Sequence, residues 1–417
     1  NNINIKNGYV FFAIQGKKSN GNLYAKKKKK KGAIAAVVDD EQISKNDKCI
    51  YVPDSLLALQ RLAEYHRSKL TIPILGITGT NGKTTTKELV ASVLSQKFNI
   101  MYTQGNFNNH IGVPLTLLGM RPETEFGIVE MGANHQGEIK TLCTIAKPDY
   151  GIITNIGKAH LEGFGSFEGV KKAKKELYDY IRSAEGTIFV NKDNWILAEL
   201  SKDISQITYG QSKRAEIMGQ IIHSPDYLNI RCDFNNIGDT SPLELKTKLV
   251  GSYNFENVMA AVAVGRYFGI DTDKIRTGIE NYIPENNRSQ IVRKGKKTII
   301  VDCYNANPTS MRAAIDNLFS MNGSKGIPVL GDMFELGNDS LREHQAILEL
   351  LRDKGFSDVF LAGKHFFGFK DKYQGFHFYQ NTDDLAHALK NISLSSSPVL
   401  IKGSRGMKME SLTHAIN

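Results

Sequence analysis

The chain has 417 residues, 41% of them hydrophobic and 23% charged, a globular composition with room for about three domains at ~150 residues each. Its formal net charge is +10, but six positive charges stand in the single run Lys26 to Lys31. A nucleic-acid surface needs cations spread among aromatic residues, so this function is disfavoured. No apolar run reaches the ~18–20 residues of a membrane span, and no secretory signal pattern is present. The four cysteines form no CxxC pair, which excludes an evident zinc site or disulfide framework and favours the cytoplasm.

Residues 1–70 are predicted to form a small α/β unit. Residues 9–14 and 33–38 are apolar runs typical of strands, and residues 55–69 carry leucine and alanine at helical spacing. The lysine run lies in a stretch suited to a short helix and has no apolar side, so we interpret it as a solvated helix face. The chain begins at Asn1 rather than methionine, and we expect natural N-terminal residues to precede it.

Residues 71–288 are predicted to form a central domain in which strands and helices alternate. The predicted strands are residues 74–78, 126–130, 151–154 and 186–190, with shorter strands over 206–250. The predicted helices include residues 83–98, 168–182 and 254–268. Such alternation indicates a mostly parallel sheet covered by helices, which binds ligands at the carboxyl ends of its strands.

Residues 289–417 repeat this alternation after the polar linker at 284–288. The predicted strands are residues 298–302, 327–331, 358–362 and 398–402. We therefore expect an α/β protein of three domains: the N-terminal unit, a central P-loop ATPase-like parallel-sheet domain, and a C-terminal Rossmann-like domain.

The strongest chemical signal is the glycine-rich loop at residues 76–85, which reads GITGTNGKTT between a strand and a helix. Glycines let backbone N–H groups approach phosphate, and the helix N-terminus favours an anion. Lys83 supplies a charge for the β- and γ-phosphates, and the Thr84 hydroxyl suits Mg²⁺. ATP and Mg²⁺ are therefore the expected cofactors. The predicted phosphate-binding residues are Gly79, Thr80, Asn81, Gly82, Lys83, Thr84 and Thr85.

Three further side chains in the central domain are candidates for chemistry. Glu130 ends an apolar strand, where a carboxylate can bind a metal. A lone histidine is more often structural than catalytic, but His160 follows the strand at 151–154 at the same sheet edge, and this position leaves the two roles equally open. Lys174 stands among neighbouring lysines in a predicted helix, and this charge pattern alone predicts a solvated face.

In the third domain, polar motifs follow two predicted strands. Asp302 could accept from a ribose hydroxyl, and Asn305 and Asn307 offer amide groups to a peptide-like ligand. Residues 402–406 read KGSRG and suit a carboxylate or phosphate.

Together these motifs resemble the Mur ligases, the ATP-dependent amide-bond enzymes of peptidoglycan synthesis. The phosphate loop lacks the first glycine of the GxxxxGK[ST] pattern, since Ile77 stands there, and looks like that family's own form. The other segments that carry the resemblance are NFNNHIGVP at 106–114, EMGANHQGE at 130–138, AHLEGFGS at 159–166, YNANP at 304–308, GDMFELG at 331–337 and KGSR at 402–405. YNANP and KGSR are typical of the member whose substrates are UDP-N-acetylmuramoyl-tripeptide and D-alanyl-D-alanine. The DNPR motif of the diaminopimelate-adding relative is not found.

The resemblance implies roles for individual residues. It makes Lys83, Glu130, His160 and Lys174 catalytic, with Thr84, Glu130, His160 and a carbamylated Lys174 as Mg²⁺ ligands. Nucleotide contacts are assigned to Asn254, Asn257, Arg288 and Asp302, and substrate contacts to Asn106, Asn108, Asn109, Asn305, Asn307, Ser404 and Arg405. The N-terminal unit holds the UDP part of the acceptor. The chain departs from the family at Tyr253, where histidine is usual, and at residues 20–22, which read NGN instead of DGH.

The implied reaction activates the tripeptide carboxylate as an acyl phosphate, which the dipeptide amine then attacks. We expect a monomer that binds no nucleic acid. Other Mur-type ligases and folylpolyglutamate synthetase are alternatives within the class. A P-loop kinase, a nucleotide-switched binding protein and a nucleic-acid-dependent ATPase are alternatives from other classes.

Overall fold

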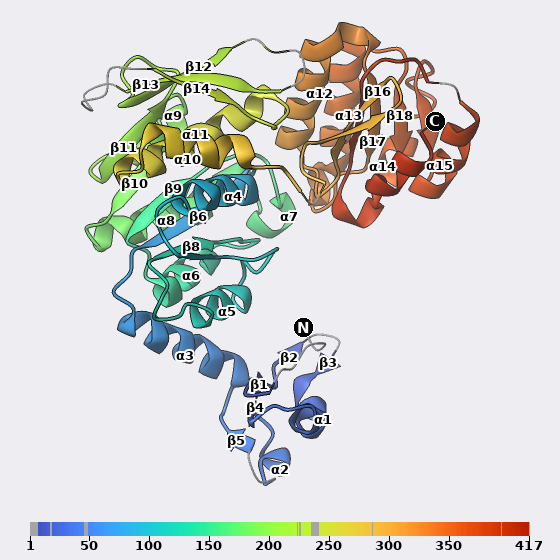
Figure 1. Cartoon of the computed structure of the whole chain (residues 1–417). Helices are drawn as coiled ribbons and strands as arrows, with labels where there is room; N and C mark the ends of the chain where they lie inside the picture. Colours follow the sequence, from blue (N-terminus) through green and yellow to red (C-terminus); the bar gives the residue numbers. More distant parts are fainter. Residues whose placement is uncertain are drawn as a thin grey trace.

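The computed structural model describes residues 7–16, 19–45, 49–222, 224, 227–234, 242–285, 287–392 and 394–416. The start of the predicted N-terminal unit and Asn286 of the predicted linker lie outside these ranges. Figure 1 shows lobes that follow one another in chain order, blue at the N-terminal end, green and yellow in the centre, and orange to red at the C-terminal end. The predicted α/β class with largely parallel sheets is confirmed.

The N-terminal lobe contains a small parallel sheet with strand order β1-β4-β5. Its elements are β1 (Val10–Phe12), β2 (Gln15–Gly16), β3 (Ser19–Asn20), α1 (Ala25–Lys30), β4 (Ala35–Val38), α2 (Glu41–Ser44), β5 (Cys49–Tyr51) and α3 (Ser55–Lys69). Helix α3 has the predicted bounds and is capped at its N-terminus by Asp54, whose carboxylate accepts from the N–H of Leu57 at 2.9 Å. The lysine run does form a helix, but its interpretation as wholly solvated is wrong. Lys28, one turn after the buried Ala25, is buried with it because α1 packs on β4.

The central lobe is built on a sheet with strand order β14-β13-β12-β11-β10-β9-β6-β8-β7. Its strands are β6 (Ile74–Thr78), β7 (Ile100–Tyr102), β8 (Phe126–Glu130), β9 (Tyr150–Ile153), β10 (Thr187–Asn191), β11 (Ser205–Gly210), β12 (Ile217–Ile222), β13 (Asn229–Phe234) and β14 (Leu243–Lys246). The helices are α4 (Lys83–Leu94), α5 (Gly112–Leu118), α6 (Glu138–Ala146), α7 (Leu161–Phe164), α8 (Phe167–Ser183), α9 (Trp195–Leu200), α10 (Phe255–Tyr267) and α11 (Thr272–Asn281). The pairing is parallel from β7 to β12, and β12 to β14 pair antiparallel. The strands predicted to be shorter over 206–250 are not, since β12 and β13 have six residues each.

Helices cover both faces of this sheet, which explains why its central strands are apolar runs without alternation. Ile74 and Val129 pack in a core with α5, α6 and α8, while Leu75 and Ile128 pack in a second core with α4, α10 and α11. Every residue of β6 and β8 is buried. Helix α4 ends at Leu94, four residues before its predicted end, because the chain turns at residues 95–97.

The C-terminal lobe has the strand order β15-β16-β20-β17-β18-β19, parallel except for β15. Its elements are β15 (Gln290–Lys294), β16 (Lys297–Asp302), α12 (Pro308–Asn322), β17 (Ile327–Gly331), α13 (Ser340–Asp353), β18 (Phe360–Ala362), α14 (Lys364–Phe367), β19 (His377–Tyr379), α15 (Thr382–Asn391) and β20 (Val399–Lys402). The carboxyl ends of β16 and β20, at Asp302 and Lys402, face the same cavity as the ends of β6 and β8 in the central lobe. The fold thus brings polar loops of two sheets together.

Candidate active site

A cavity of about 900 Å³ lies between the central and C-terminal lobes. Sixteen of the predicted site residues line it: Thr80, Asn81, Gly82, Lys83, Thr84, Thr85, Asn108, Asn109, Glu130, His160, Asn254, Asn257, Arg288, Asp302, Asn305 and Asn307. Five others do not line it: Gly79, Asn106, Lys174, Ser404 and Arg405. Residues far apart in the sequence therefore converge on one space, as expected for a site assembled by two domains.

The phosphate loop runs from the end of β6 into α4 and requires its glycines. Gly79 and Gly82 have φ of 144° and 77°, in the region that side chains rarely adopt. A Cβ at Gly79 would lie 2.0 Å from Thr154 Oγ1, and one at Gly82 would lie 2.4 Å from Asn257 Oδ1. The Lys83 ammonium donates to the carbonyls of Gly79 at 2.8 Å and Thr80 at 3.0 Å. Burial lowers the pKa of Lys83, against the opposing effect of the Glu130 carboxylate.

The carboxylate of Glu130 is buried at the end of β8 and is surrounded by donors. The Thr84 hydroxyl lies 3.0 and 3.2 Å from its two oxygens, and Asn108 Nδ2 donates to it at 2.9 Å. A Cβ at Gly132 would lie 2.9 Å from Asn108 Cγ, so this glycine permits the approach of Asn108. The buried Lys87 ammonium, which sequence reasoning missed, lies 3.9 Å from Glu130. Its position four residues after Lys83, on the same helix face, was the available signal.

His160 follows β9 and has a left-handed backbone, with φ of 50°. Its Nδ1 lies 2.5 Å from Oε2 of Glu335, a residue of the C-terminal lobe. Hydrogen bonding from the His160 ring lowers the pKa of the Glu335 carboxyl. Glu335 lies in the GDMFELG segment, but no role for it can be predicted from the sequence because nothing local connects it to His160.

Lys174 is buried on α8, which corrects the solvated face that its lysine-rich neighbourhood predicted. It falls at helical spacing with Val170, Ala173 and Leu177, all of which are buried. Its ammonium lies 5.5 Å from the centre of the Phe164 ring. Burial, helped by the nearby charge of Lys83, lowers the pKa of Lys174 to about 7. A large fraction of this amine is therefore uncharged at neutral pH, unlike an ordinary lysine.

Asn254 and Asn257 lie buried at the start of α10 and line the cavity. Asn257 donates to the side-chain oxygen of Asn254 at 2.8 Å and accepts from the Thr86 hydroxyl at 3.0 Å. Asn254 donates in turn to the Val250 carbonyl at 2.8 Å. These amides are thus held in fixed orientations on the wall next to the phosphate loop.

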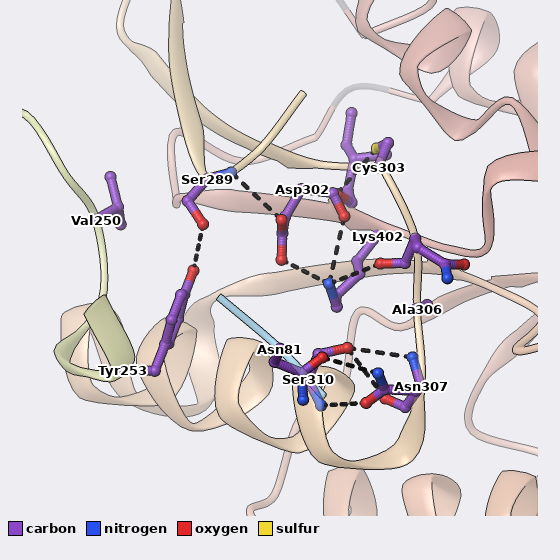
Figure 2. A network of polar contacts seen from close by, with 12 residues as sticks. Asn81, Val250, Tyr253, Ser289, Asp302, Cys303, Ala306, Asn307, Ser310 and Lys402 are labelled. Atoms are coloured by element: carbon purple, nitrogen blue, oxygen red, sulfur yellow. Dashed lines mark hydrogen bonds and ion pairs between the residues drawn. The ribbon is translucent and has the colours of Figure 1, made fainter. Parts of the chain in front are cut away.

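A polar network joins the two lobes beside their connection (Figure 2). The Tyr253 and Ser289 hydroxyls lie 2.7 Å apart, and the Ser289 N–H donates to Asp302 at 3.3 Å. Asp302 in turn accepts from the buried Lys402 ammonium at 2.6 Å. Glycine at position 251 leaves room for the Tyr253 ring, because a Cβ at Gly251 would lie 2.3 Å from Cε1 of that ring.

Arg288 lies in this connection with its guanidinium 3.4 Å from the centre of the Tyr304 ring. Its Nε is buried without a hydrogen-bond partner among the described residues. A buried donor without a partner is unusual, and in a ligand cavity it is suited to an anionic ligand.

The two asparagines of the YNANP segment line the cavity, as does Lys402 of the KGSR segment, but Ser404 and Arg405 do not. Asn307 caps α12, and its Nδ2 donates to Oδ1 of Asn81 in the phosphate loop at 2.8 Å, as Figure 2 shows. Ser404 accepts from the N–H of Phe334 at 2.8 Å, and Arg405 pairs with Glu410 at 3.1 Å. Ser404 therefore supports the loop after β17, while Arg405 is held at the surface.

Comparisons with known proteins agree with this geometry. Residues 77–265 match the model of the Mur ligase middle domain, and residues 287–405 match that of the Mur ligase glutamate ligase domain. The chain is 34% identical to the UDP-N-acetylmuramoyl-tripeptide–D-alanyl-D-alanine ligase of Bacillus subtilis, over 88% of this chain and 81% of the relative. It is 32% identical to the ligase of the same name from Escherichia coli, over 98% and 91% of the two chains.

The solved structure of MurF from Acinetobacter baumannii has a TM-score of 0.88 with this chain at 30% identity, covering 98% of this chain and 90% of that one. The fold and the cavity thus define a nucleotide-binding ligase built from separate domains. The chain belongs to the Mur ligase family. In the described part of the chain, no helix is both long and apolar enough to cross a membrane.

Proposed function

We propose that this chain joins the amino group of D-alanyl-D-alanine to the terminal carboxyl of UDP-N-acetylmuramoyl-tripeptide, converting ATP to ADP and phosphate. The ligases of this name from two bacteria support the proposal, each at more than 30% identity over most of its length. The observation that carries it is the direct contact between the phosphate loop and the amide-rich YNANP loop, through Asn81 and Asn307, in one cavity. A kinase needs no such second loop next to its phosphate site.

The residues around Glu130 suit Mg²⁺. The Thr84 hydroxyl at the first turn of α4 and the buried Glu130 carboxylate at the end of β8 both line the cavity. Mg²⁺ in proteins prefers such oxygens together with phosphate oxygens. We assign Thr84 and Glu130 to hold this ion, with His160, which lines the same cavity, as a further ligand. When bound, Mg²⁺ neutralises charge on the transferred phosphoryl group. We also assign Lys174 to a second ion as a carbamate, formed when its uncharged amine adds CO₂ and releases a proton.

The residues of the chain then act mainly by positioning. Lys83 and the backbone of the phosphate loop hold the γ-phosphate near the tripeptide carboxylate, whose oxygen attacks phosphorus and displaces ADP. Arg288 and Asp302 hold the nucleotide on the C-terminal side. Asn305 and Asn307 orient the dipeptide, whose amine attacks the acyl carbon, and phosphate leaves from the tetrahedral intermediate. Closure of the two lobes excludes water from the acyl phosphate.

Each domain has a part in this proposal. Residues 71–288 bind ATP, residues 289–417 bind the dipeptide and close on ATP, and residues 1–70 hold the UDP part of the acceptor. Ser404 and Arg405 shape the dipeptide side from behind, and Asn106 acts with Asn108 and Asn109 on the acceptor side. The free state of all four cysteines fits the cytoplasm in which we place the protein. We propose that it acts as a monomer.

The acyl-phosphate step can be tested by isotope transfer. Purified protein receives ATP, Mg²⁺, D-alanyl-D-alanine and UDP-N-acetylmuramoyl-tripeptide whose terminal carboxylate carries ¹⁸O. The released phosphate should contain one ¹⁸O atom, and its release should depend on the dipeptide. Phosphate release that is unaffected by the dipeptide would contradict the function and indicate a simple ATPase, and a stable phosphorylated product would contradict it and favour a kinase.

A further inference from the structure

The contact between His160 and Glu335 joins two domains at the proposed metal site. His160 follows β9 of the central sheet, while Glu335 lies in the loop after β17 of the C-terminal sheet. Nδ1 of the ring lies 2.5 Å from the carboxylate, and Glu162 N–H donates to the Glu335 carbonyl at 3.4 Å. The two loops are therefore docked through backbone as well as side chains.

Both residues of the pair have an unusual backbone conformation. His160 has φ of 50° and Glu335 has φ of 62°, although neither is glycine. Such conformations cost free energy and persist where the surrounding structure imposes them, most often at functional sites. The chain thus maintains two strained positions that face each other across a domain boundary.

We propose that Glu335 is a positioning residue that orients His160 for metal binding, so that the metal site is complete only when the C-terminal lobe is docked. This inference rests on the proposed function, which makes His160 a ligand. Because Nδ1 donates to Glu335, Nε2 is the nitrogen left with a lone pair, and His160 lines the cavity. Metal-ligating histidines typically donate their other ring nitrogen to a carboxylate or carbonyl, which sets the tautomer.

The pair has a consequence for the order of the reaction. Glu335 belongs to the lobe that carries Asn305 and Asn307, so docking of the proposed dipeptide-binding lobe and completion of the metal site are one event. Phosphoryl transfer then begins only with the lobe in place, where it shields the acyl phosphate from water.

A second interdomain ion pair offers a matched control. Lys158 Nζ lies 2.7 Å from Glu343 on α13, and this pair joins the same two lobes without contacting a proposed ligand.

Mn²⁺ binding in the presence of ADP is measured by electron paramagnetic resonance for the full chain. We expect Glu335→Leu to weaken Mn²⁺ binding about tenfold, the lower end of the effect seen for such supporting carboxylates. Glu335→Gln, which keeps an acceptor, should recover most of this loss, and Glu343→Gln should bind Mn²⁺ as the unaltered protein does.

Three outcomes would overturn the inference. The first is a folded Glu335→Leu variant that binds Mn²⁺ as tightly as the unaltered protein. The second is an equal loss of Mn²⁺ affinity in Glu335→Leu and Glu343→Gln. The third is a crystal structure of the unaltered protein with Mn²⁺ and ADP in which Nδ1 of His160 ligates the metal. Electron paramagnetic resonance of His160→Ala separates failure of this inference from failure of the proposed metal site. If the nitrogen coupling to Mn²⁺ persists in this variant, His160 is not a ligand and the proposed metal assignment itself fails.

Discussion

Asn307 Nδ2 donates a hydrogen bond to Asn81 Oδ1 at 2.8 Å, although the two residues are 226 positions apart in the chain. Asn81 belongs to the phosphate loop, and Asn307 is the capping residue of α12 in the C-terminal lobe. The same side chain therefore stabilises a helix through its oxygen and joins two substrate loops through its nitrogen.

These two roles of Asn307 can be separated by substitution. Asn307→Ser keeps a capping side chain but is too short to reach Asn81, so we expect near-unaltered stability and about a fivefold lower kcat/KM for the dipeptide, the effect of one neutral hydrogen bond. Asn307→Ala should in addition lose about 1 kcal/mol of unfolding free energy with the cap. Steady-state kinetics and urea unfolding measure the two effects. Full additivity of Asn307→Ser with Asn81→Ala would show that the two loops are not coupled.

Lys83 should contribute charge that neighbouring residues cannot replace. Lys83→Met removes the ammonium that lies over the carbonyls of the phosphate loop, and we expect kcat to fall by about two to three orders of magnitude. Binding of the UDP-linked acceptor, measured by calorimetry, should change little because that ligand is assigned to the N-terminal lobe. Activity close to that of the unaltered enzyme would contradict the loop assignment.

The ion pair of Asp302 with Lys402 should respond differently to the loss of each partner. The Lys402 side chain is 2% exposed and that of Asp302 is 16% exposed. Asp302→Asn leaves a deeply buried ammonium without its counter-charge, and we expect a loss of about 3 kcal/mol of unfolding free energy. Lys402→Met leaves a carboxylate that the cavity can solvate, so its cost should be smaller. Denaturant unfolding tests this order, and the double variant should be more stable than Asp302→Asn alone.

In CO₂-free buffer, where Lys174 stays a free amine, the stability of the protein should depend on pH through this residue. Its pKa falls from 10.5 to about 7 on folding, so between these values the unfolded chain binds one more proton than the folded one. Stability therefore rises with pH across this window, by about 1.4 kcal/mol per pH unit at most, and this dependence is absent below about pH 7. Lys174→Met should lack this rise when unfolding is compared at pH 7.5 and 9. Parallel pH profiles for both proteins would contradict the lowered pKa.

Local patterns in the sequence determined the class of fold and much of the phosphate site. Residues 74–78 form the predicted strand, because a continuous apolar run reflects burial on both faces of a sheet. Residues 55–69 form the predicted helix, because apolar residues at helical spacing reflect burial of one helix face. The phosphate loop could also be read directly, since its glycines, Lys83 and Thr84 act within one turn of backbone.

Tertiary structure decided which side chains support this site. The charge pattern predicted Lys174 to be solvated, but the packing of α8 buries it and changes its proton affinity. The pairs of Asn81 with Asn307 and of His160 with Glu335 join residues more than 150 positions apart. No local propensity encodes such contacts, because they arise only when two separately folded sheets dock with the carboxyl ends of their strands facing each other.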